Sequence, residues 1–402
     1  MKSPVTVSEA IEIIRQNTVL LGNVTVALDH ALGRVLSEDI CAGENIPPFD
    51  NAGMDGFAVR HEDLQTVPKT LHLIGEIPAG INPADRLGSG EAMAIMTGAK
   101  IPAGCTAVVR QEDTKSVGAS EVSIQRVVRE GENIRRAGND IKSGSLVLRS
   151  RTRLRPQDLG ILASLGIPFV QVFRVPRVAL LATGRELVPV AGMPPAGKIR
   201  NSNTTILTAL LKESGSEVID LGIAGDNEAE LRAAILNGLS ADVLITIGGV
   251  SVGKYDLVKK VLEETRVQLQ FTKINVKPGM PTVFGMCGRT AVFGLPGNPV
   301  SSMVAFLKFV RPAIWNMTGL AGEQYQPVLR ARIAHTITKP DQKRHFSRGV
   351  LESRNGTLWV RQTGAQTSNM LTSLSNANCL MSIPEDVTEL AVGSEVEVEL
   401  LT

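Results

Sequence analysis

Apolar residues repeat at two different spacings along the chain, and each change of spacing marks a change of structure. The run SEAIEIIRQ (8–16) places apolar side chains at helical spacing, with Ser8 as the expected N-cap. From about residue 24 to residue 143, short β-type runs alternate with Gly/Pro turns, which predicts a mostly β insertion. RPQDLGILASLG then predicts a helix with Pro156 in its first turn and an end at Gly166.

The stretch from Arg177 to Leu320 alternates apolar strands with amphipathic helices. The runs RVALLAT, EVIDLG, DVLITIG, TVFG and TAVFG are typical of buried strands. The runs NSNTTILTALLKESG, NEAELRAAILNGL, DLVKKVLEE and NPVSSMVAFLKFVRPAIWNMTG are typical of helices. This alternation predicts a doubly wound, mostly parallel sheet with helices on both faces. From about residue 326 the β texture returns, which predicts a small C-terminal barrel or sandwich.

Together these textures predict an α/β plus β protein of several domains, for which 402 residues are sufficient. The expected α/β domain spans residues 176–324, and the inserted mostly β domain spans residues 24–141. Residues 325–402 are expected to form the C-terminal β domain. Residues 1–23 and 142–175 are expected to form an elongated linking and dimerisation domain.

Composition narrows the class of protein. With 43% hydrophobic and 20% charged residues, the chain has the composition of an ordinary soluble protein. A net charge of +2 gives no global field that favours nucleic acid or a membrane, so an anion site must be built locally. The N-terminus lacks the pattern of a signal peptide, and no apolar run approaches about 20 residues, so we expect a cytoplasmic protein. The cysteines are scattered and are expected to be reduced and mostly buried: Cys41, Cys105, Cys287 and Cys379.

Candidate binding loops follow four predicted strands of the α/β domain. Ligands bind beyond the carboxyl ends of strands in such sheets, where helix N-termini converge. Glycines and carboxylates fill these loops, which are Gly184-Arg185-Glu186, IAGDN with Asp226, GGVSVGKYD with Ser251 and Asp256, and Leu295-Pro296-Gly297-Asn298-Pro299. Four such loops on one edge indicate a ligand site rather than turn chemistry alone.

The loop GGVSVGK has the spacing of a Walker A motif, but Tyr255 stands where Ser or Thr must ligate Mg²⁺. One interpretation is a tight turn that needs Gly248 and Gly249 for backbone reasons. A P-loop ATPase or GTPase is another. We favour a separate phosphate-holding turn, in which backbone N–H groups up to Gly253 cradle the anion and Asp256 faces a metal ion.

Two further segments carry candidate residues. Lys273, Asn275 and Lys277 alternate, so one strand would project all three to the same face and offer two lysines to an oxyanion. A solvated edge strand with protective lysines is the alternative. In the insertion, Asp55 and Thr97 lie in glycine-rich stretches, which taken alone are typical of turns with local hydrogen bonds.

These motifs together resemble the molybdopterin molybdenumtransferase family, the molybdenum insertases that include the E domain of gephyrin. The matching pieces span nearly the whole chain and are PPFDNAGMDGFAV, MTGAKIPAGCTAVV, ATGREL, GGVSVGKYD, VKPGMP, GLPGNPVSS and NMLTSLSNANCLMSIPE. The resemblance implies an elongated four-part subunit whose α/β part is similar in fold to molybdopterin adenylyltransferases. It also implies a homodimer, with each site shared between the α/β part of one subunit and the β insertion of the other.

The implied reaction inserts molybdenum from molybdate into adenylylated molybdopterin and releases AMP, with Mg²⁺ as the cation and a molybdopterin adenylyltransferase as transient donor. The resemblance places functional residues at Asp55, Thr97, Glu186, Asp226, Asp256, Lys273, Lys277 and Ser368. Asp226 and Asp256 are expected to hold Mg²⁺, and Lys273 and Lys277 to contact molybdate or phosphate oxygens. Pro296, Gly297, Asn298 and Pro299 are expected to shape the pterin or phosphate pocket.

Two positions depart from the family pattern. Arg185 replaces the acid of the usual T-G-D-E-L, and Met280 replaces the second lysine of K-P-G-K-P. We hypothesise that Arg185 takes over part of the anion binding that a lysine at position 280 would provide. Alternatives to the molybdate reaction are a tungstate-preferring insertase, a molybdopterin adenylyltransferase and a non-catalytic scaffold.

Overall fold

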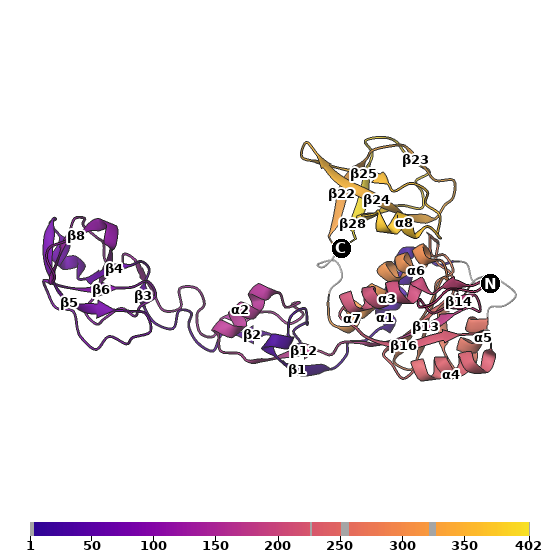
Figure 1. Ribbon diagram of the computed structural model, residues 1–402, viewed down its shortest axis with the longest axis horizontal. Helices are drawn as coiled ribbons and strands as arrows, with labels where there is room; N and C mark the ends of the chain where they lie inside the picture. Colours follow the sequence, from indigo (N-terminus) through magenta and orange to yellow (C-terminus); the bar gives the residue numbers. More distant parts are fainter. Residues whose placement is uncertain (1–3, 226, 251–256, 321–326, 402) are drawn as a thin grey trace.

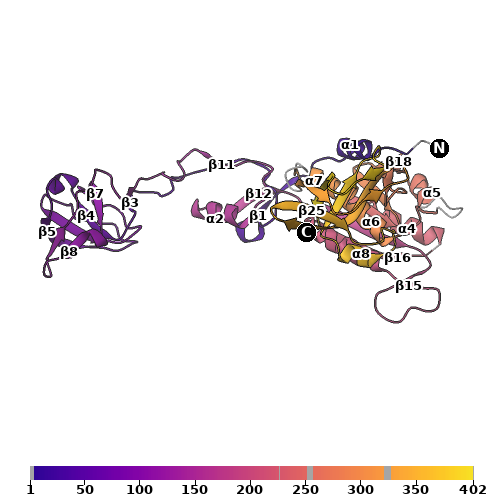
Figure 2. The same ribbon diagram turned by 90° about the horizontal axis from the view of Figure 1, so that it is seen from above.

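The computed structural model describes residues 4–225, 227–250, 257–320 and 327–401. The molecule is elongated, with a β domain at one end, a narrow middle part, and an α/β domain that carries the C-terminal β domain at the other end (Figure 1). The view from above shows the same separation (Figure 2). Among the described residues, none of the helices has the length and apolar character that crossing a membrane requires.

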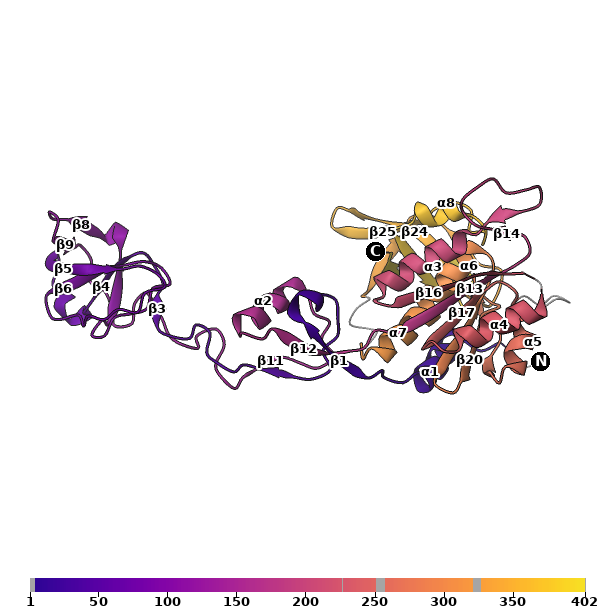
Figure 3. The same ribbon diagram turned by 60° about the horizontal axis from the view of Figure 1, so that its bottom comes forward.

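A six-stranded sheet in the order β16-β13-β17-β21-β20-β18 forms the α/β domain, which Figure 3 shows from below. Its strands are β13 (Arg177–Thr183), β16 (Glu217–Ala224), β17 (Val243–Ile247), β18 (Gln268–Phe271), β20 (Val283–Cys287) and β21 (Thr290–Leu295). The first four strands of the order are parallel, which confirms the predicted doubly wound sheet. The last two are antiparallel to their neighbours, because TVFG and TAVFG form a hairpin.

Helices cover both faces of this sheet. They are α3 (Ser202–Glu213), α4 (Glu228–Gly238), α5 (Leu257–Glu264), α6 (Pro299–Ala305), the π-helix η4 (Phe306–Val310) and α7 (Arg311–Met317). Alternate residues of β13 face opposite sides: Val178 and Leu180 pack with α3 and α6, and Ala179 and Leu181 pack with α4 and α5. The single long helix predicted for residues 298–319 is interrupted by η4. Pro312 has no N–H with which to continue an α-helical hydrogen bond to residue 308, and a π turn accommodates that gap.

The N-cap of the N-terminal helix α1 (Val7–Asn17) lies two residues before the expected one. Thr6, not Ser8, is the N-cap: its hydroxyl accepts from the Glu9 N–H at 3.2 Å, and its own N–H donates to the Glu9 carboxylate at 2.7 Å. The buried side chains of α1 join the core formed by β13, β17 and α6. Helix α1 therefore packs with the α/β domain rather than with the linking domain, to which the sequence pattern assigns residues 1–23.

The middle part consists of two short antiparallel strand pairs, one α-helix and one 3-10 helix. Its elements are β1 (Asn23–Ala27), η1 (Leu28–His30), β2 (Ile40–Cys41), β11 (Leu146–Leu148), α2 (Pro156–Ser164) and β12 (Phe169–Phe173). As predicted, α2 begins with Pro156 in its first turn, and Gly166 follows its end with a φ of +67°. Because β1 pairs with β12 and β2 with β11, residues 24–41 lie here and not in the inserted sheet.

The inserted domain is built on a six-stranded sheet in the order β7-β4-β6-β5-β9-β8, with apolar clusters on both faces. Its elements are β3 (Asn51–Ala52), β4 (Gly56–Val59), η2 (His61–Leu64), β5 (Lys69–Ile77), β6 (Glu91–Ile95), β7 (Ala107–Arg110), η3 (Gln111–Asp113), β8 (Thr114–Ser116), β9 (Glu121–Ile124) and β10 (Ile134–Arg135). Gly56 is required sterically, because a Cβ there would lie 1.9 Å from the carbonyl oxygen of Val109.

The C-terminal domain is a closed barrel, because β24 pairs with both β25 and β26 in the cycle β24-β25-β22-β28-β26. Its elements are β22 (Val328–Ile333), β23 (Ile337–Thr338), β24 (Arg344–Arg354), β25 (Thr357–Gln362), α8 (Leu371–Ser375), β26 (Cys379–Ile383), β27 (Glu389–Leu390) and β28 (Glu395–Leu400). A buried contact docks the barrel on the α/β domain: Lys308 of η4 pairs with Glu399 and lies 4.5 Å from the centre of the Phe346 ring. Burial lowers the pKa of Lys308 despite the attraction of Glu399.

Two short pairs lie near the candidate site. Strand β14 (Leu187–Val188) pairs with β15 (Ile199–Arg200) in an excursion beside β13, and β19 (Val276–Lys277) leaves the α/β domain to pair with β24 of the barrel. All four cysteines are free, as expected, but they are not mostly buried: Cys379 is buried, Cys105 and Cys287 are half-buried, and Cys41 is exposed.

Candidate functional site

The carboxyl ends of β13, β16, β17 and β21 meet at one edge of the sheet because these strands are parallel. Hydrogen bonds hold the loops that follow in place. The Gly248 N–H donates to Leu295 O at 2.9 Å, and the Gly184 N–H donates to Ala224 O at 3.3 Å. These bonds join the described starts of the four loops in two pairs, and the pairs lie side by side because β13 is next to β17.

Gly248 and Gly249 open the loop after β17, and both have left-handed backbone, with φ of +87° and +65°. A Cβ at Gly248 would lie 2.7 Å from Thr183 O, and one at Gly249 would lie 2.4 Å from a methyl group of Val258. Both positions therefore require glycine, for the backbone conformation and for lack of space for a Cβ atom. Ser251 and Gly253, which are expected to complete a phosphate cradle, lie outside the described residues.

A first cavity of about 780 Å³ lies beside the ends of β13 and β16. We call it the β13–β16 cavity; its polar lining includes Arg185, Lys198, Asn201, Thr204, Thr205 and Asp220. Lys198 donates to the backbone carbonyl of Arg185, and this contact ties the β14–β15 excursion to the cavity wall. The neighbouring Glu186 is exposed and folds back over Gly184, where a Cβ would meet its carboxylate at 2.5 Å.

A second cavity of about 830 Å³ lies between the α/β domain and the barrel, and we call it the interdomain cavity. Four of the predicted site residues line it together: Lys277, Pro296, Asn298 and Ser368. The Asn298 amide donates to the Ser368 hydroxyl at 2.9 Å, and this bond joins the start of α6 to a loop of the barrel domain. The sequence does not show that these residues meet, because they are far apart along the chain and the contact depends on how the barrel docks onto the α/β domain.

Arg348 also lines the interdomain cavity, and sequence reasoning missed it. It is only 1% exposed and donates to Ala365 O, Gln366 O, Thr367 O and the Ser373 hydroxyl at 3.0 to 3.4 Å. Burial lowers the pKa of Arg348 to about 10, so the side chain stays charged at neutral pH. An arginine inside a β-type run was the only available signal, and such a run does not reveal which face is buried.

The expectation that one strand projects Lys273, Asn275 and Lys277 to one face is wrong. Strand β18 ends at Phe271, and only Val276 and Lys277 form β19. Between them the backbone pairs with the segment before α1: the Val5 N–H donates to Lys273 O at 3.1 Å, and the Asn275 N–H donates to Val5 O at 2.7 Å. Of the three residues, Lys277 lines the interdomain cavity.

Asp55 and Thr97 are joined by two hydrogen bonds in the inserted domain. One Asp55 oxygen accepts from the Thr97 N–H at 2.6 Å and from its hydroxyl at 2.8 Å, and these bonds lower the pKa of the carboxyl group. Both residues lie beside β4 and β6, at the end of the molecule opposite the α/β domain (Figure 1). A single chain therefore does not bring them to either cavity.

Two departures from the family pattern lie in different cavities. Arg185 lines the β13–β16 cavity, whereas Met280 lines the interdomain cavity. This separation argues against the hypothesis that Arg185 takes over the anion binding of a lysine at position 280.

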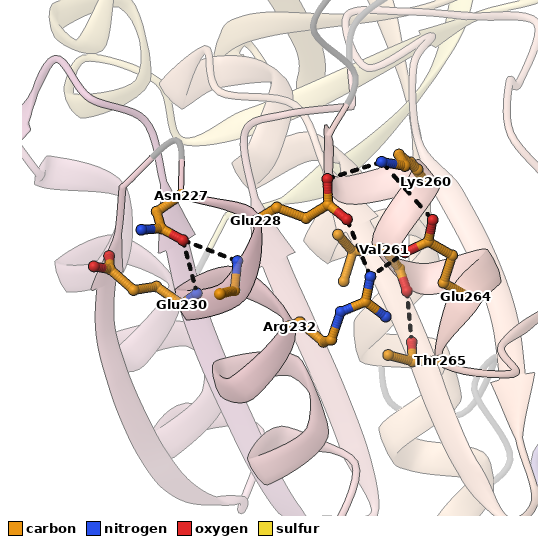
Figure 4. A network of polar contacts seen from close by, with 9 residues as sticks. Asn227, Glu228, Glu230, Arg232, Lys260, Val261, Glu264 and Thr265 are labelled. Atoms are coloured by element: carbon orange, nitrogen blue, oxygen red, sulfur yellow. Dashed lines mark hydrogen bonds and ion pairs between the residues drawn. The ribbon is translucent and has the colours of Figure 1, made fainter.

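The predicted metal ligands Asp226 and Asp256 lie outside the described residues. The helices that follow them, α4 and α5, are joined by an ion-pair network (Figure 4). Arg232 contacts both Glu228 and Glu264, and Lys260 contacts Glu228 at 2.8 Å. Across the ranges that the structure describes, no three His, Cys, Asp or Glu side chains gather as a metal site.

Comparison with known proteins decides the family. Residues 5–166 match the family described as MoeA N-terminal region (domain I and II), residues 179–316 a probable molybdopterin binding domain, and residues 330–401 the MoeA C-terminal region (domain IV). Molybdopterin molybdenumtransferase 2 of Mycobacterium tuberculosis (strain ATCC 25618 / H37Rv) is 37% identical over 94% of this chain and 95% of its own length. The chain belongs to the molybdopterin molybdenumtransferase family.

Other members of the molybdopterin molybdenumtransferase family agree with this assignment. The Haemophilus influenzae enzyme is 38% identical over 92% of each chain. The crystal structure of the molybdopterin biosynthesis moeA protein from Pyrococcus horikoshii OT3 is similar with a TM-score of 0.85 and 31% identity, covering 99% of this chain and 100% of that one. The expected fold and the expected enzyme of molybdenum cofactor biosynthesis are thus confirmed.

Proposed function

We propose that this molybdopterin molybdenumtransferase transfers molybdenum from molybdate to adenylylated molybdopterin and releases AMP. The observation that carries the proposal is the interdomain cavity, where Lys277, Lys343 and Arg348 meet around one space large enough for a tetrahedral oxyanion. Hydrogen bonds from charged donors to an oxyanion are each worth about 1.5–3 kcal/mol, more than bonds between neutral groups. A protein of net charge +2 has thereby built its anion site locally.

Lys277 is the proposed direct contact to the oxyanion, since its side chain is 52% exposed at the cavity. Arg348 is the proposed positioning residue: its bonds to three successive carbonyls hold the loop that presents Ser368. Asn298 holds the Ser368 hydroxyl from the other domain. We keep Lys273 as a candidate contact for phosphate oxygens, on the family resemblance alone.

The β13–β16 cavity is the proposed site of the pterin or nucleotide part of the substrate. Its lining offers hydroxyl, amide and carboxylate groups that suit a polar heterocycle, and Arg185 adds a cation for phosphate. The loops that follow β17 and β21 lie at the same edge of the sheet; their residues are Gly248, Gly249, Pro296, Gly297, Asn298 and Pro299. We propose that they shape the phosphate passage, with Glu186 beside it and with Ser251 and Gly253 as candidate contacts.

Magnesium is the proposed cation, and Asp226 and Asp256 are its proposed ligands. Carboxylates are suitable donors for Mg²⁺, which would neutralise phosphate charge when bound. This assignment comes from the sequence pattern and the family resemblance, and no step of the proposed reaction depends on its geometry.

A homodimer would explain the separation of Asp55 and Thr97 from both cavities. We propose that the inserted domain of one subunit reaches the site of its partner, where the ionised Asp55 takes part in catalysis together with Thr97. Exposed apolar side chains on the middle part support a contact there: Leu32, Leu146 and Phe169 are 58%, 43% and 60% exposed. A molybdopterin adenylyltransferase is the proposed transient donor, and the cytoplasm the proposed location.

Replacing Lys277 with alanine tests the oxyanion site. Loss of one charged donor is expected to weaken molybdate binding by about tenfold while leaving thermal stability unchanged, because the side chain is half exposed. Isothermal titration calorimetry with molybdate, and with tungstate in parallel, measures the effect. Lys115→Ala, a lysine change in the exposed strand β8, is the matched control. Equal affinity in both variants would contradict the proposed site.

Mixed dimers test the shared site. Asp55→Ala and Asp226→Ala are each expected to be inactive alone, whereas their equal mixture should recover about a quarter of wild-type activity. Half of the dimers are then mixed, and one of the two sites in each mixed dimer is intact. Subunits are exchanged by co-expression with two affinity tags, and cofactor assembly is assayed in the whole mixture and in the doubly tagged fraction, where every dimer is mixed and about half of wild-type activity is expected. Recovery that stays at background in this fraction would show that each subunit works with its own insertion.

A further inference from the structure

Lys277 and His345 lie side by side at the wall of the interdomain cavity. They are register partners in the parallel pair of β19 and β24, so their side chains point to the same face. Both line the cavity. A cation and a titratable ring therefore share one wall of the proposed oxyanion site, although they come from different domains.

Asp341 bridges these two residues. One of its oxygens lies 2.7 Å from Nε2 of His345 and accepts from the Lys343 N–H at 3.3 Å. Its other oxygen lies 3.7 Å from Nζ of Lys277. The contact with His345 is short and mostly buried, since only 14% of the His345 side chain is exposed. The contact with Lys277 is long and open, so Lys277 can leave while His345 stays.

A buried lysine holds the loop that carries Asp341 in place. Lys339 is 2% exposed and donates to the backbone carbonyls of Asp341, Lys343 and Glu385 at 3.0, 2.8 and 2.9 Å. Arg344 pairs with the Glu385 carboxylate at 3.1 Å and holds the same turn against β26. Because this turn is held, Asp341 cannot follow Lys277 when the lysine turns toward a bound anion.

The charges around His345 come from four segments. Lys339, Asp341 and Lys343 lie on the loop before β24, Arg344 begins β24, Glu385 follows β26, and Lys277 lies on β19. Burial lowers the pKa of His345, and the positive charges of Lys277 and Lys339 lower it further, while Asp341 raises it. Burial alone would raise the pKa of Asp341, but His345, the Lys343 N–H and Lys277 bring it below its ordinary value.

We propose that Asp341 is an internal counter-ion which Lys277 exchanges for the oxyanion, and that His345 takes up a proton during the exchange. The proposal rests on the proposed oxyanion site and adds a specificity-determining carboxylate and a proton partner to it. When an oxyanion neutralises Lys277, His345 loses a nearby repelling charge and Asp341 loses the compensating charge of the lysine. Both changes favour the protonated ring. Since linkage is reciprocal, oxyanion affinity then rises as pH falls through the range in which His345 titrates.

The test is calorimetric titration of the full-length protein with molybdate, and with sulfate, which stays a dianion near neutral pH. Titrations in two buffers of different ionisation enthalpy give the protons taken up, and titrations between about pH 6 and pH 8.5 give the pH dependence. The wild type should take up protons on binding and bind roughly fivefold more tightly at the acid end. His345→Gln keeps a donor for Asp341 and should remove both effects. Asp341→Asn should bind more tightly than the wild type at the alkaline end.

Each result decides the proposal. Binding without proton uptake in the wild type, uptake that persists in His345→Gln, or weaker binding in Asp341→Asn would overturn the exchange. If either variant fails to fold, the wild-type proton count and the other variant remain decisive. Lys277→Ala distinguishes a failure of the exchange from a failure of the proposed oxyanion site. Unchanged oxyanion affinity there contradicts the site itself, whereas reduced affinity without wild-type proton uptake contradicts only the exchange.

Discussion

Replacing Gly248 with alanine is expected to lower the free energy of unfolding by about 3 kcal/mol and to abolish activity. The left-handed backbone at this position, with a φ of +87°, costs an alanine about 1–2 kcal/mol by itself. The added Cβ would also lie 2.7 Å from Thr183 O, and that oxygen belongs to the central strand β13. Relief requires β13 and β17 to separate at the edge where the candidate loops begin.

Gly215→Ala is the matched control for this change. Gly215 has a φ of +77° in the same domain, but its Cβ would meet nothing within 4 Å. It should therefore show the backbone cost alone, and its activity should stay near that of the wild type. Urea unfolding of the two variants, with molybdate titrations beside it, measures the difference. Equal decreases of stability in both would show that the contact with Thr183 does not matter.

Replacing Arg348 with methionine is expected to cost about 3 kcal/mol or more of stability and to weaken molybdate binding more strongly than Lys277→Ala. Arg348 is 1% exposed and is hydrogen bonded to three successive carbonyls, which methionine would leave without donors in the interior. The loop that presents Ser368 would then lose its support. Arg348→Lys should recover only part of this stability, because an ammonium has three donors on one nitrogen, whereas Arg348 reaches four acceptors from three nitrogens.

Arg354→Met is the control for the arginine change, because it lies on the same strand, β24. Arg354 is exposed and contacts Glu352 at 3.1 Å, so its removal should cost less than about 1 kcal/mol. Chemical unfolding and molybdate affinity are measured for both variants. If Arg348→Met unfolds at the same urea concentration as Arg354→Met, the buried arginine does not hold the loop as described.

Local patterns predicted the parts of the fold that local physics determines. The apolar run RVALLAT identified β13, Pro156 marked the start of α2, and Gly166 marked its end. The N-cap of α1 was misplaced by two residues, because Thr6 and Ser8 are both plausible caps and Glu9 decides between them only through its own bond. The strand expected for residues 273–277 failed for a longer-range reason, since Val5 takes up the intervening backbone.

The site was predicted in part for the same reason. Lys277, Pro296 and Asn298 were named from their motifs and Ser368 from the family resemblance, but their meeting in one cavity depends on the docking of the barrel onto the α/β domain. Arg348, His345 and Asp341 belong to that docked surface and carry no motif. No pattern within β24 shows that it pairs with β19, and this pairing places His345 beside Lys277.

The release of AMP tests the proposed insertion reaction most directly. The purified protein is incubated with adenylylated molybdopterin and Mg²⁺, with and without molybdate, and AMP is followed over time. We expect release that depends on the oxyanion, and we expect Lys277→Ala to need about tenfold more molybdate for the same rate. Release of AMP at the same rate without any oxyanion, or no release with it, would contradict the insertion reaction.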